Sequence, residues 1–180
     1  MALVAFLRGV NVGGRRTFRP SILAQQLRRY DAVSVGAAGT FVFHKAVSQA
    51  VLRAEFQRRL PFEAEVMICT GRDLIAMASG DPFGNESIHP DVVRFVSVLA
   101  KRPRVLPSLP LALPADGDWL LRILATENRF IFGVYRRHMK TIRYLSMIDT
   151  LFGVPVTTRN WNTILAIAKL LHDQGPTNHG

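Results

Sequence analysis

The chain has 180 residues, of which 48% are hydrophobic and 20% are charged, and its formal net charge at pH 7 is +10. This size and composition favour a folded protein with a sizeable core and exclude an intrinsically disordered chain. No run approaches the roughly 18 apolar residues of a membrane span, and Cys69 is the only cysteine, which excludes an internal disulfide and a metal site built from several thiolates of one chain.

The chain opens with an apolar stretch, residues 2–7, that leads directly into Arg8. No basic region precedes this stretch and no small-residue cleavage site follows it, so it predicts a first strand and not a signal peptide. We therefore expect a cytoplasmic protein without a membrane segment. Cys69 ends another apolar run, with no histidine nearby in sequence, and is expected to be a buried structural thiol.

Hydrophobic periodicity in the first half predicts the order β-α-β-β-α-β with one more helix behind it. The predicted elements are strand 2–8, helix 21–30, strands 33–37 and 40–45, helix 47–59, strand 64–69 and helix 71–79. Gly39-Thr40 supplies the hairpin turn, and Thr70 is placed to cap the helix that follows it. This order is that of the ferredoxin-like fold, with two helices on one face of a four-stranded antiparallel sheet.

Turn-forming residues near 81–88 break the helical pattern and predict a short linker between an N-terminal half, 1–82, and a C-terminal half, 88–174. Residues 174–180 are expected to be a flexible C-terminus. The second half predicts strands 92–100, 119–125 and 129–135 and helices near 141–152 and 160–172, and the four prolines within 103–114 allow only a short helix there. We therefore predict an α+β protein of two ferredoxin-like halves, with mostly antiparallel sheets and helices packed on one face.

The positive charge comes almost entirely from arginine, because the chain has only four lysines. Arginine binds two oxygens of a phosphate or carboxylate at once, and a positive field attracts anions. The alternative is a genome that favours arginine codons, with the charges spread over a solvated surface. The sequence leaves both interpretations open.

A glycine-rich loop between the first strand and the first helix is the first candidate site. Its candidate ligand-binding residues are Arg8, Gly9, Asn11, Gly13, Gly14, Arg15 and Arg16. Glycines permit positive φ angles and a close backbone approach, and the arginines add paired donors for an anion. The loop lacks the Gly-Lys-Ser/Thr ending of a phosphate-binding Walker loop. The alternative is a plain turn that redirects the chain.

A polar segment, residues 153–163, is the second candidate site and is expected to lie just before the last helix. Its candidate ligand-binding residues are Thr158, Arg159, Asn160, Trp161 and Asn162. The hydroxyls and amides are suited to cap that helix, and the N-terminus of a helix also favours an anion. The Trp161 ring is available either to stack on a ligand or to pack on the core.

These two segments, residues 7–14 and 157–163, resemble the two signatures of the bacterial family catalogued as domain of unknown function 1697. The resemblance implies a duplicated ferredoxin-like fold and implies no activity. Two positions depart from the family: residues 37–40 read Ala-Ala-Gly-Thr where relatives carry Gln-Ser-Gly-Asn, and only Lys140-Thr141 stands near the family's Ser-Lys-Leu-Thr pattern. If these positions form a site in the family, this member has an altered or lost one, and the sequence leaves that open.

Other chemistry-bearing residues give weaker indications. The five histidines have no metal-ligand spacing, no nucleophile elbow is present, and we expect neither a metal nor a cofactor. The basic run 136–140 reads as a solvated turn in preference to a phosphate contact. Phe41 and Phe43 alternate on one strand face, which favours a core position over a base-stacking platform.

Three functions remain open from the sequence. We favour a binding module for nucleic acid or a phosphate-bearing ligand. The second is an enzyme that holds a small anionic substrate with Arg8, Asn11, Arg159 and Asn160, although no general base is evident. The third is a structural or interaction protein whose signatures serve folding alone. The sequence predicts no oligomeric state.

Overall fold

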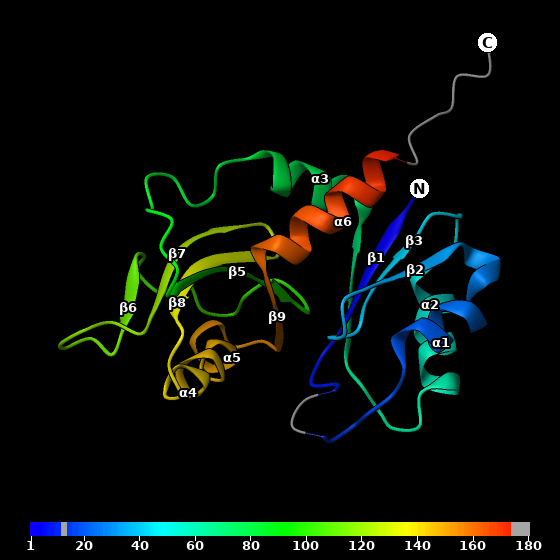
Figure 1. The fold of residues 1–180 in the computed structure, drawn as a ribbon, viewed down its shortest axis with the longest axis horizontal. Coiled ribbons are helices and arrows are strands. Elements are labelled where there is room, and N and C mark those ends of the chain that lie inside the picture. Colours follow the sequence, from blue (N-terminus) through cyan, green and yellow to red (C-terminus); the bar gives the residue numbers. More distant parts are fainter. Residues whose placement is uncertain (12–13, 174–180) are drawn as a thin grey trace, which may run out of the picture. The chain divides into compact units, whose positions relative to one another are not determined.

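Short apolar strands alternating with helices produce two antiparallel sheets in the computed structural model, which describes residues 1–11 and 14–173 (Figure 1). One compact unit comprises residues 1–78 together with the last helix from residue 162, and the other comprises residues 79–161. We call them unit 1 and unit 2. They differ from the predicted halves because the last helix belongs to unit 1. None of the described helices combines the length and apolarity of a membrane span.

Unit 1 realises the predicted β-α-β-β-α-β order. Its elements are β1 (Leu3–Leu7), α1 (Pro20–Gln26), a 3-10 turn η1 (Arg28–Tyr30), β2 (Ala32–Val35), β3 (Thr40–Phe43), α2 (Gln49–Arg59), β4 (Val66–Thr70), α3 (Gly71–Ser79) and α6 (Trp161–Asp173), whose first residue is assigned to unit 2. The strands pair antiparallel in the order β2-β3-β1-β4. This strand order is ferredoxin-like and confirms the predicted fold class.

The helices of unit 1 begin where the sequence offers a suitable start. Pro20 occupies the first turn of α1, where its missing N–H costs nothing. The Ser48 hydroxyl caps α2 by accepting from the Val51 N–H at 3.2 Å, and the Thr70 hydroxyl accepts from the Asp73 N–H at 3.0 Å, as predicted for α3. The predicted helix 21–30 ends early, because the chain tightens into η1, as helix C-termini often do.

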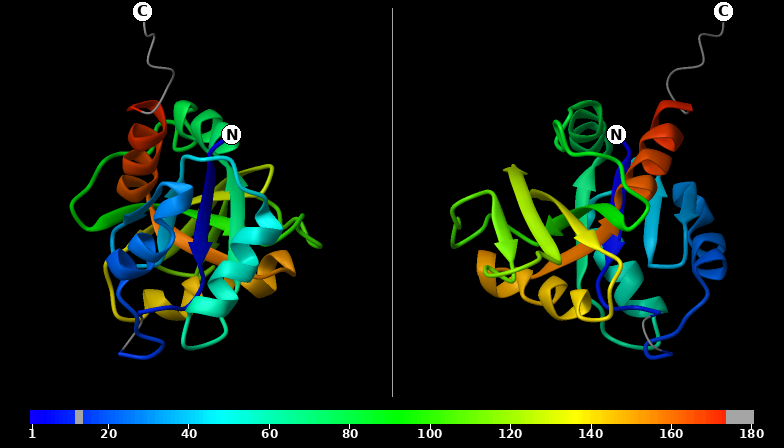
Figure 2. Two further views of the ribbon diagram at one scale, coloured as in Figure 1. Left: turned by 90° about the vertical axis from the view of Figure 1, so that its right-hand side faces the viewer. Right: turned by 60° about the vertical axis from the view of Figure 1, so that its left-hand side comes forward.

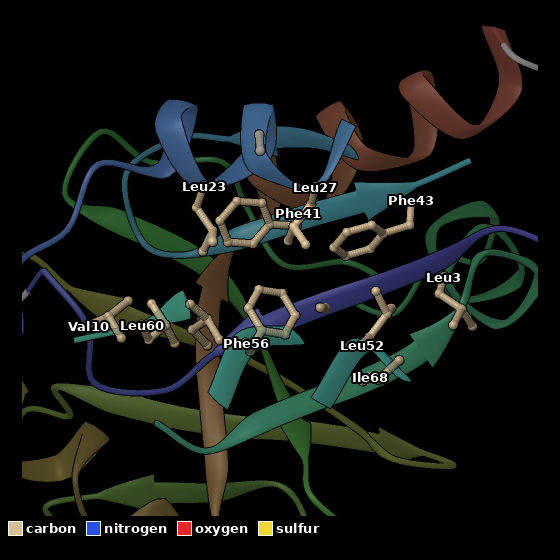
Figure 3. Close-up of a cluster of buried hydrophobic side chains, with 13 residues drawn as sticks. Leu3, Val10, Leu23, Leu27, Phe41, Phe43, Leu52, Phe56, Leu60 and Ile68 are labelled. Carbon is tan, nitrogen blue, oxygen red and sulfur yellow. The ribbon is translucent and has the colours of Figure 1, made fainter. Parts of the chain in front are cut away.

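Helices α1 and α2 cover one face of the sheet of unit 1. The left view of Figure 2 shows both helices in front of β1. Figure 3 shows the core between the helices and this face, where Leu23 of α1, Leu27 just after it and Phe56 of α2 meet Phe41 and Phe43 of β3. Both phenylalanines of β3 are fully buried, which confirms that they belong to the core. They are therefore not available as a platform for bases.

The opposite face of this sheet is also apolar and buried. Val4, Phe6, Val42 and Met67 alternate with the core residues along β1, β3 and β4, and each is at most 1% exposed. Cys69 is buried on the same face, in agreement with its predicted structural role. Neither face of this sheet presents an open aromatic surface.

The last helix, α6, packs within unit 1 through one apolar stripe. Its buried residues, Ile164, Ile167, Ala168 and Leu171, follow the spacing of a helix with one covered face. Leu171 lies so close to Gly71 that a Cβ added to the glycine would be 3.0 Å from the leucine Cδ2. This contact fastens α6 to the start of α3.

Unit 2 has a five-stranded antiparallel sheet with two short helices beneath it (Figure 1). Its elements are β5 (Val92–Leu99), β6 (Leu111–Leu113), β7 (Leu121–Glu127), β8 (Phe130–Arg136), α4 (Thr141–Leu145), α5 (Ile148–Phe152) and β9 (Val156–Asn160). The strand order is β6-β7-β8-β5-β9, so β7-β8-β5-β9 repeats the ferredoxin-like order and β6 adds an edge. The core packs Phe95, Leu121 and Ile131 of the strands against Ile148 and Phe152 of α5.

The local structure of this half differs from the sequence prediction at three places. The proline-rich segment 103–114, where at most a short helix was expected, contains the short strand β6 and no helix, because an edge strand tolerates flanking prolines that a helix interior rejects. The helix predicted over 141–152 is two helices separated at residues 146–147. The segment 153–163, expected to lie just before the last helix, contains strand β9, which was not predicted and which pairs with β5.

Candidate functional site

The glycine-rich loop after β1 is bent by residues with positive φ. These are Gly9 at 66°, Asn11 at 54°, Gly14 at 72° and Arg16 at 49°. Two of the four are not glycine, and such conformations are uncommon for side chains with a Cβ. Gly13, which the sequence also assigned to this site, lies outside the described residues.

Asn11 braces this loop in three directions. Its Nδ2 donates to the Ala37 carbonyl at 2.9 Å, its Oδ1 accepts from the Phe18 N–H at 2.9 Å, and its own N–H donates to the Arg16 carbonyl at 3.1 Å. The side chain therefore holds the loop against the β2–β3 turn and against the approach to α1. Asn11 acts here as a positioning residue, with its polar atoms already engaged.

The three arginines of the loop differ in what they contact. Arg8 forms an ion pair with Glu65, with Nη1 3.4 Å from Oε1, and its backbone N–H donates to the Glu65 carbonyl at 3.0 Å. The side chains of Arg15 and Arg16 are exposed, and neither has a hydrogen bond or an ion pair with another described residue. The braced loop thus presents two guanidinium groups to solvent.

The second predicted segment contains strand β9, and the side chains of Thr158 and Arg159 form hydrogen bonds within the sheet. The Thr158 hydroxyl lies 2.6 Å from the Ser97 hydroxyl on the neighbouring strand β5. Arg159 is 7% exposed and donates from Nη1 to the Thr157 hydroxyl and to the Thr158 carbonyl, both at 2.9 Å. Burial lowers the pKa of Arg159 to about 10, so it stays charged at neutral pH.

The residues at the junction of β9 and α6 differ in how far their side chains are exposed to solvent. Asn160 is the exposed last residue of β9, and Asn162 is exposed in the first turn of α6. Trp161 is half-buried and packs edge-on against Phe83, with ring centroids 5.0 Å apart. The structure therefore places Arg8, Asn11, Arg15 and Arg16 in one loop of unit 1. It places Thr158, Arg159 and Asn160 on β9 and Trp161 directly after it in unit 2, and Asn162 in unit 1.

Sequence reasoning missed a carboxylate that holds three arginines. Glu55 of α2 is only 4% exposed, and its Oε1 accepts from Arg29 at 2.6 Å, while its Oε2 accepts from Arg58 at 2.6 Å and from Arg59 at 2.8 Å. The Tyr30 hydroxyl also reaches Oε1, at 3.2 Å, and Arg29 in turn donates to that hydroxyl. We call these five residues the Glu55 cluster.

Opposing effects set the pKa of Glu55. Burial alone would raise it, but hydrogen bonds from Arg58, Arg59 and Tyr30 outweigh burial and lower the pKa of Glu55 from 4.5 to about 2. One carboxylate therefore faces three guanidinium groups, and the cluster keeps an excess of two positive charges at neutral pH. The side chains of Arg29 and Arg58 are 64% and 65% exposed, so this excess charge faces solvent.

The glycine-rich loop lies next to the end of α2. Phe18, which follows the loop, meets Phe62 just after α2 with ring centroids 6.2 Å apart. At the other end of the loop, the Arg8–Glu65 ion pair joins the same part of the chain. Residues 1–30 contain six arginines and no acidic residue, and two of these arginines, Arg8 and Arg29, pair with Glu65 and Glu55 from the segment around α2.

The sequence profile of the family described as "Protein of unknown function (DUF1697)" matches residues 1–109 of the chain. The chain belongs to this family. The match contains the glycine-rich loop and the Glu55 cluster, and it ends before the segment 157–163 that carried the second part of the resemblance.

Two further comparisons complete this picture. The chain is similar to the solved structure of conserved bacterial protein SP0830 from Streptococcus pneumoniae, with a TM-score of 0.58, 17% identity, and coverage of 94% of this chain and 98% of that chain. At this identity the likeness shows the fold alone. No curated protein matches the chain.

Two cavities of unit 1 are lined by none of the site residues predicted from the sequence. One, of about 480 Å³, is lined by Ala2, Gly71, Arg72, Ile75, Ala76 and Leu171. The other, of about 400 Å³, is lined by Met1, Ala2, Asp31, His44, Lys45 and Leu171. Within residues 1–11 and 14–173, no three His, Cys, Asp or Glu side chains gather in a way that would hold a metal ion.

Proposed function

We propose that this protein binds nucleic acid through exposed arginines of unit 1. The observation that carries the proposal is the Glu55 cluster, in which one buried carboxylate fixes three guanidinium groups and leaves two positive charges uncompensated. Arginines fixed in this way lose less conformational freedom when they bind phosphate than arginines that move freely in solvent.

The arrangement of these charges supports a polymer in preference to a small anion. Five of the exposed arginines of unit 1 come from separate elements: Arg15 and Arg16 from the loop, Arg19 before α1, Arg29 from η1 and Arg58 from α2. None of these five lines a cavity described above, whereas Arg72, another exposed arginine of unit 1, lines the first cavity. Phosphates repeated along a nucleic acid match charges spread over a surface, because each contact adds affinity through released counterions.

Recognition in unit 1 would rest on phosphates and not on bases. The aromatic residues of its central hairpin, Phe41 and Phe43, are buried, so a sheet platform of the RNA-recognition type is absent from the described part of this unit. Arginines that contact phosphates position a protein on its ligand without reading the sequence. The proposal therefore predicts binding with little sequence preference at unit 1. It also includes a cytoplasmic location, where such a ligand would be met.

The experiment is a fluorescence-anisotropy titration of the full chain into end-labelled single-stranded and duplex oligonucleotides. Between about 50 and about 200 mM salt, a protein with several phosphate contacts loses orders of magnitude in affinity. The proposal expects such a loss with either oligonucleotide. Absence of binding at the lowest salt concentration would contradict it.

A further inference from the structure

Two arginines of unit 2 lie over one tryptophan ring. The Cζ atoms of Arg122 and Arg136 are 4.2 and 4.1 Å from the centroid of the Trp119 indole. Arg136 also donates from Nε to the Trp119 carbonyl at 2.9 Å. Guanidinium groups at this distance from an indole ring are attracted by its π-face, and tryptophan gives the strongest such attraction among the aromatic side chains.

The sheet holds both arginines on one face. Arg122 of β7 pairs with Val134 of β8, so Arg136, two residues further along β8, points to the same side of the sheet. Trp119 lies just before β7. The two guanidinium groups are therefore brought to the same ring by strand register, and not by a flexible loop.

Arg122 forms an ion pair with a carboxylate, whereas Arg136 has no ion pair with a described carboxylate. Arg122 donates from Nη2 to Oε2 of Glu86 at 2.6 Å, and its Nε is buried with no hydrogen-bond partner among the described residues. A buried donor without a partner is destabilising, so the ion pair and the ring contact must hold this side chain in place. The terminal nitrogens of Arg136 have no hydrogen bond or ion pair with another described residue.

We propose that Trp119, Arg122 and Arg136 form a base-stacking site for single-stranded nucleic acid. Unpaired bases stack on aromatic rings and also on guanidinium planes, and stacking on such platforms is tolerant of sequence. All three side chains are half-buried, which holds them in place while leaving part of each surface open. Arg137 and Lys140, further along the chain, are exposed and extend the positive surface from the end of β8.

A base and not a phosphate is the group that this site fits. Two exposed acidic residues, Asp116 and Asp118, precede Trp119 and lower the positive charge there, and Glu86 already neutralises Arg122. Repulsion from these carboxylates disfavours a phosphate, whereas the π-face of a base carries no charge to repel. The site rests on the proposed function for its ligand, nucleic acid, and adds the preference for a single strand.

The test uses the fluorescence of Trp119 itself. The chain has two tryptophans, so Trp161→Phe leaves Trp119 as the sole indole and keeps an aromatic ring against Phe83. This variant is titrated with an unlabelled single-stranded oligothymidylate and, separately, with a duplex, while anisotropy of a labelled strand reports overall binding. We expect quenching of Trp119 by the single strand and much weaker quenching by the duplex, whose bases are already stacked.

Variants at the site separate stacking from charge. Trp119→Ala is expected to weaken single-strand binding about tenfold, and Trp119→Phe is expected to recover most of that loss because a ring remains. Arg136→Lys keeps the charge but loses the planar group, and it is expected to weaken binding to a single strand more than to a duplex. Lys101→Ala, an exposed charge of the same unit, is the control and is expected to affect both ligands equally.

Each outcome decides the inference. If the strand binds by anisotropy while Trp119 emission stays constant and Trp119→Ala and Trp119→Phe bind like the unmodified chain, the stacking site is refuted and binding by unit 1 stands. Equal quenching by single strand and duplex also refutes it. If no strand binds even at low salt, both the site and the proposed function fail.

Discussion

The Oδ1 atom of Asn11 accepts a hydrogen bond from the Phe18 N–H at 2.9 Å, across the glycine-rich loop. Through this bond, the end of β1 is fixed to the approach to α1. The Nδ2 of the same side chain donates to the Ala37 carbonyl at 2.9 Å, in the turn between β2 and β3. The exposed guanidinium groups of Arg15 and Arg16 are therefore carried by a loop whose shape depends on one amide side chain.

Replacing Asn11 is expected to loosen the loop and to lower stability. Asn11→Ala removes two side-chain hydrogen bonds and leaves a Cβ residue at a φ of 54°, which together should cost about 2–3 kcal/mol. Asn11→Gly loses the same bonds but adopts this φ freely, so its cost should be smaller. Urea denaturation measures both, and a change below about 0.5 kcal/mol for Asn11→Ala, as for ordinary surface sites, would refute the bracing role.

Two glycines of the β2–β3 turn provide a matched pair for testing how closely the turn packs on the loop. A Cβ at Gly39 would lie 2.7 Å from Cγ2 of Val10 and 2.9 Å from Cβ of Leu7, whereas a Cβ at Gly36 would meet nothing within 4 Å. Both residues have positive φ, at 83° and 65°. Gly36→Ala should cost about 1 kcal/mol, and Gly39→Ala about 1–3 kcal/mol more in urea denaturation. Equal costs would show that the turn does not need this close approach.

The Glu55 cluster predicts a pH dependence of stability. The folded-state pKa of Glu55, about 2, lies below its ordinary value of 4.5, so its contribution is complete above about pH 4.5 and is lost as the pH falls towards 2. Glu55→Gln should lower stability at neutral pH by about 2 kcal/mol, the scale of hydrogen bonds to charged groups. Denaturation curves of both proteins should converge between about pH 4.5 and pH 2. A gap that stays constant over this range would contradict the low pKa.

Much of the fold could be predicted because local patterns and the tertiary structure agree. In unit 1, the short apolar runs of β1 and β3 mark strands, and the structure buries them on both faces. Strand β9 was missed because Val156–Asn160 is short and polar, and because its formation depends on pairing with the distant strand β5. The two adjacent β-branched residues Thr157 and Thr158 were nevertheless a usable signal for a strand. Strand β6 was missed because its flanking prolines indicated an irregular segment.

The candidate site could be predicted only in part, because some of its contacts join residues that are far apart in the sequence. The loop arginines stand out in the sequence because they are adjacent to glycines. The spacing of Glu55 from Arg58 and Arg59 is that of neighbours on a helix surface, so part of the Glu55 cluster was accessible. Arg29 joins the cluster from η1, 26 residues away, and only the packing of α1 beside α2 brings it there. The contact of Trp119 with Arg122 and Arg136 depends in the same way on the pairing of β7 with β8.

The most direct test of the central claim, that unit 1 binds nucleic acid through its arginines, compares the salt dependence of binding in two double variants. Arg15→Ala/Arg16→Ala and Lys101→Ala/Arg102→Ala each remove two exposed positive charges, the first from the braced loop of unit 1 and the second from a turn of unit 2. Anisotropy titrations over a salt series give the slope of log affinity against log salt, which falls by about one for each phosphate that the variant no longer neutralises. We predict a slope reduced by about two in the loop variant and nearly unchanged in the control. Equal reductions in both variants, or none in the loop variant, would contradict the account.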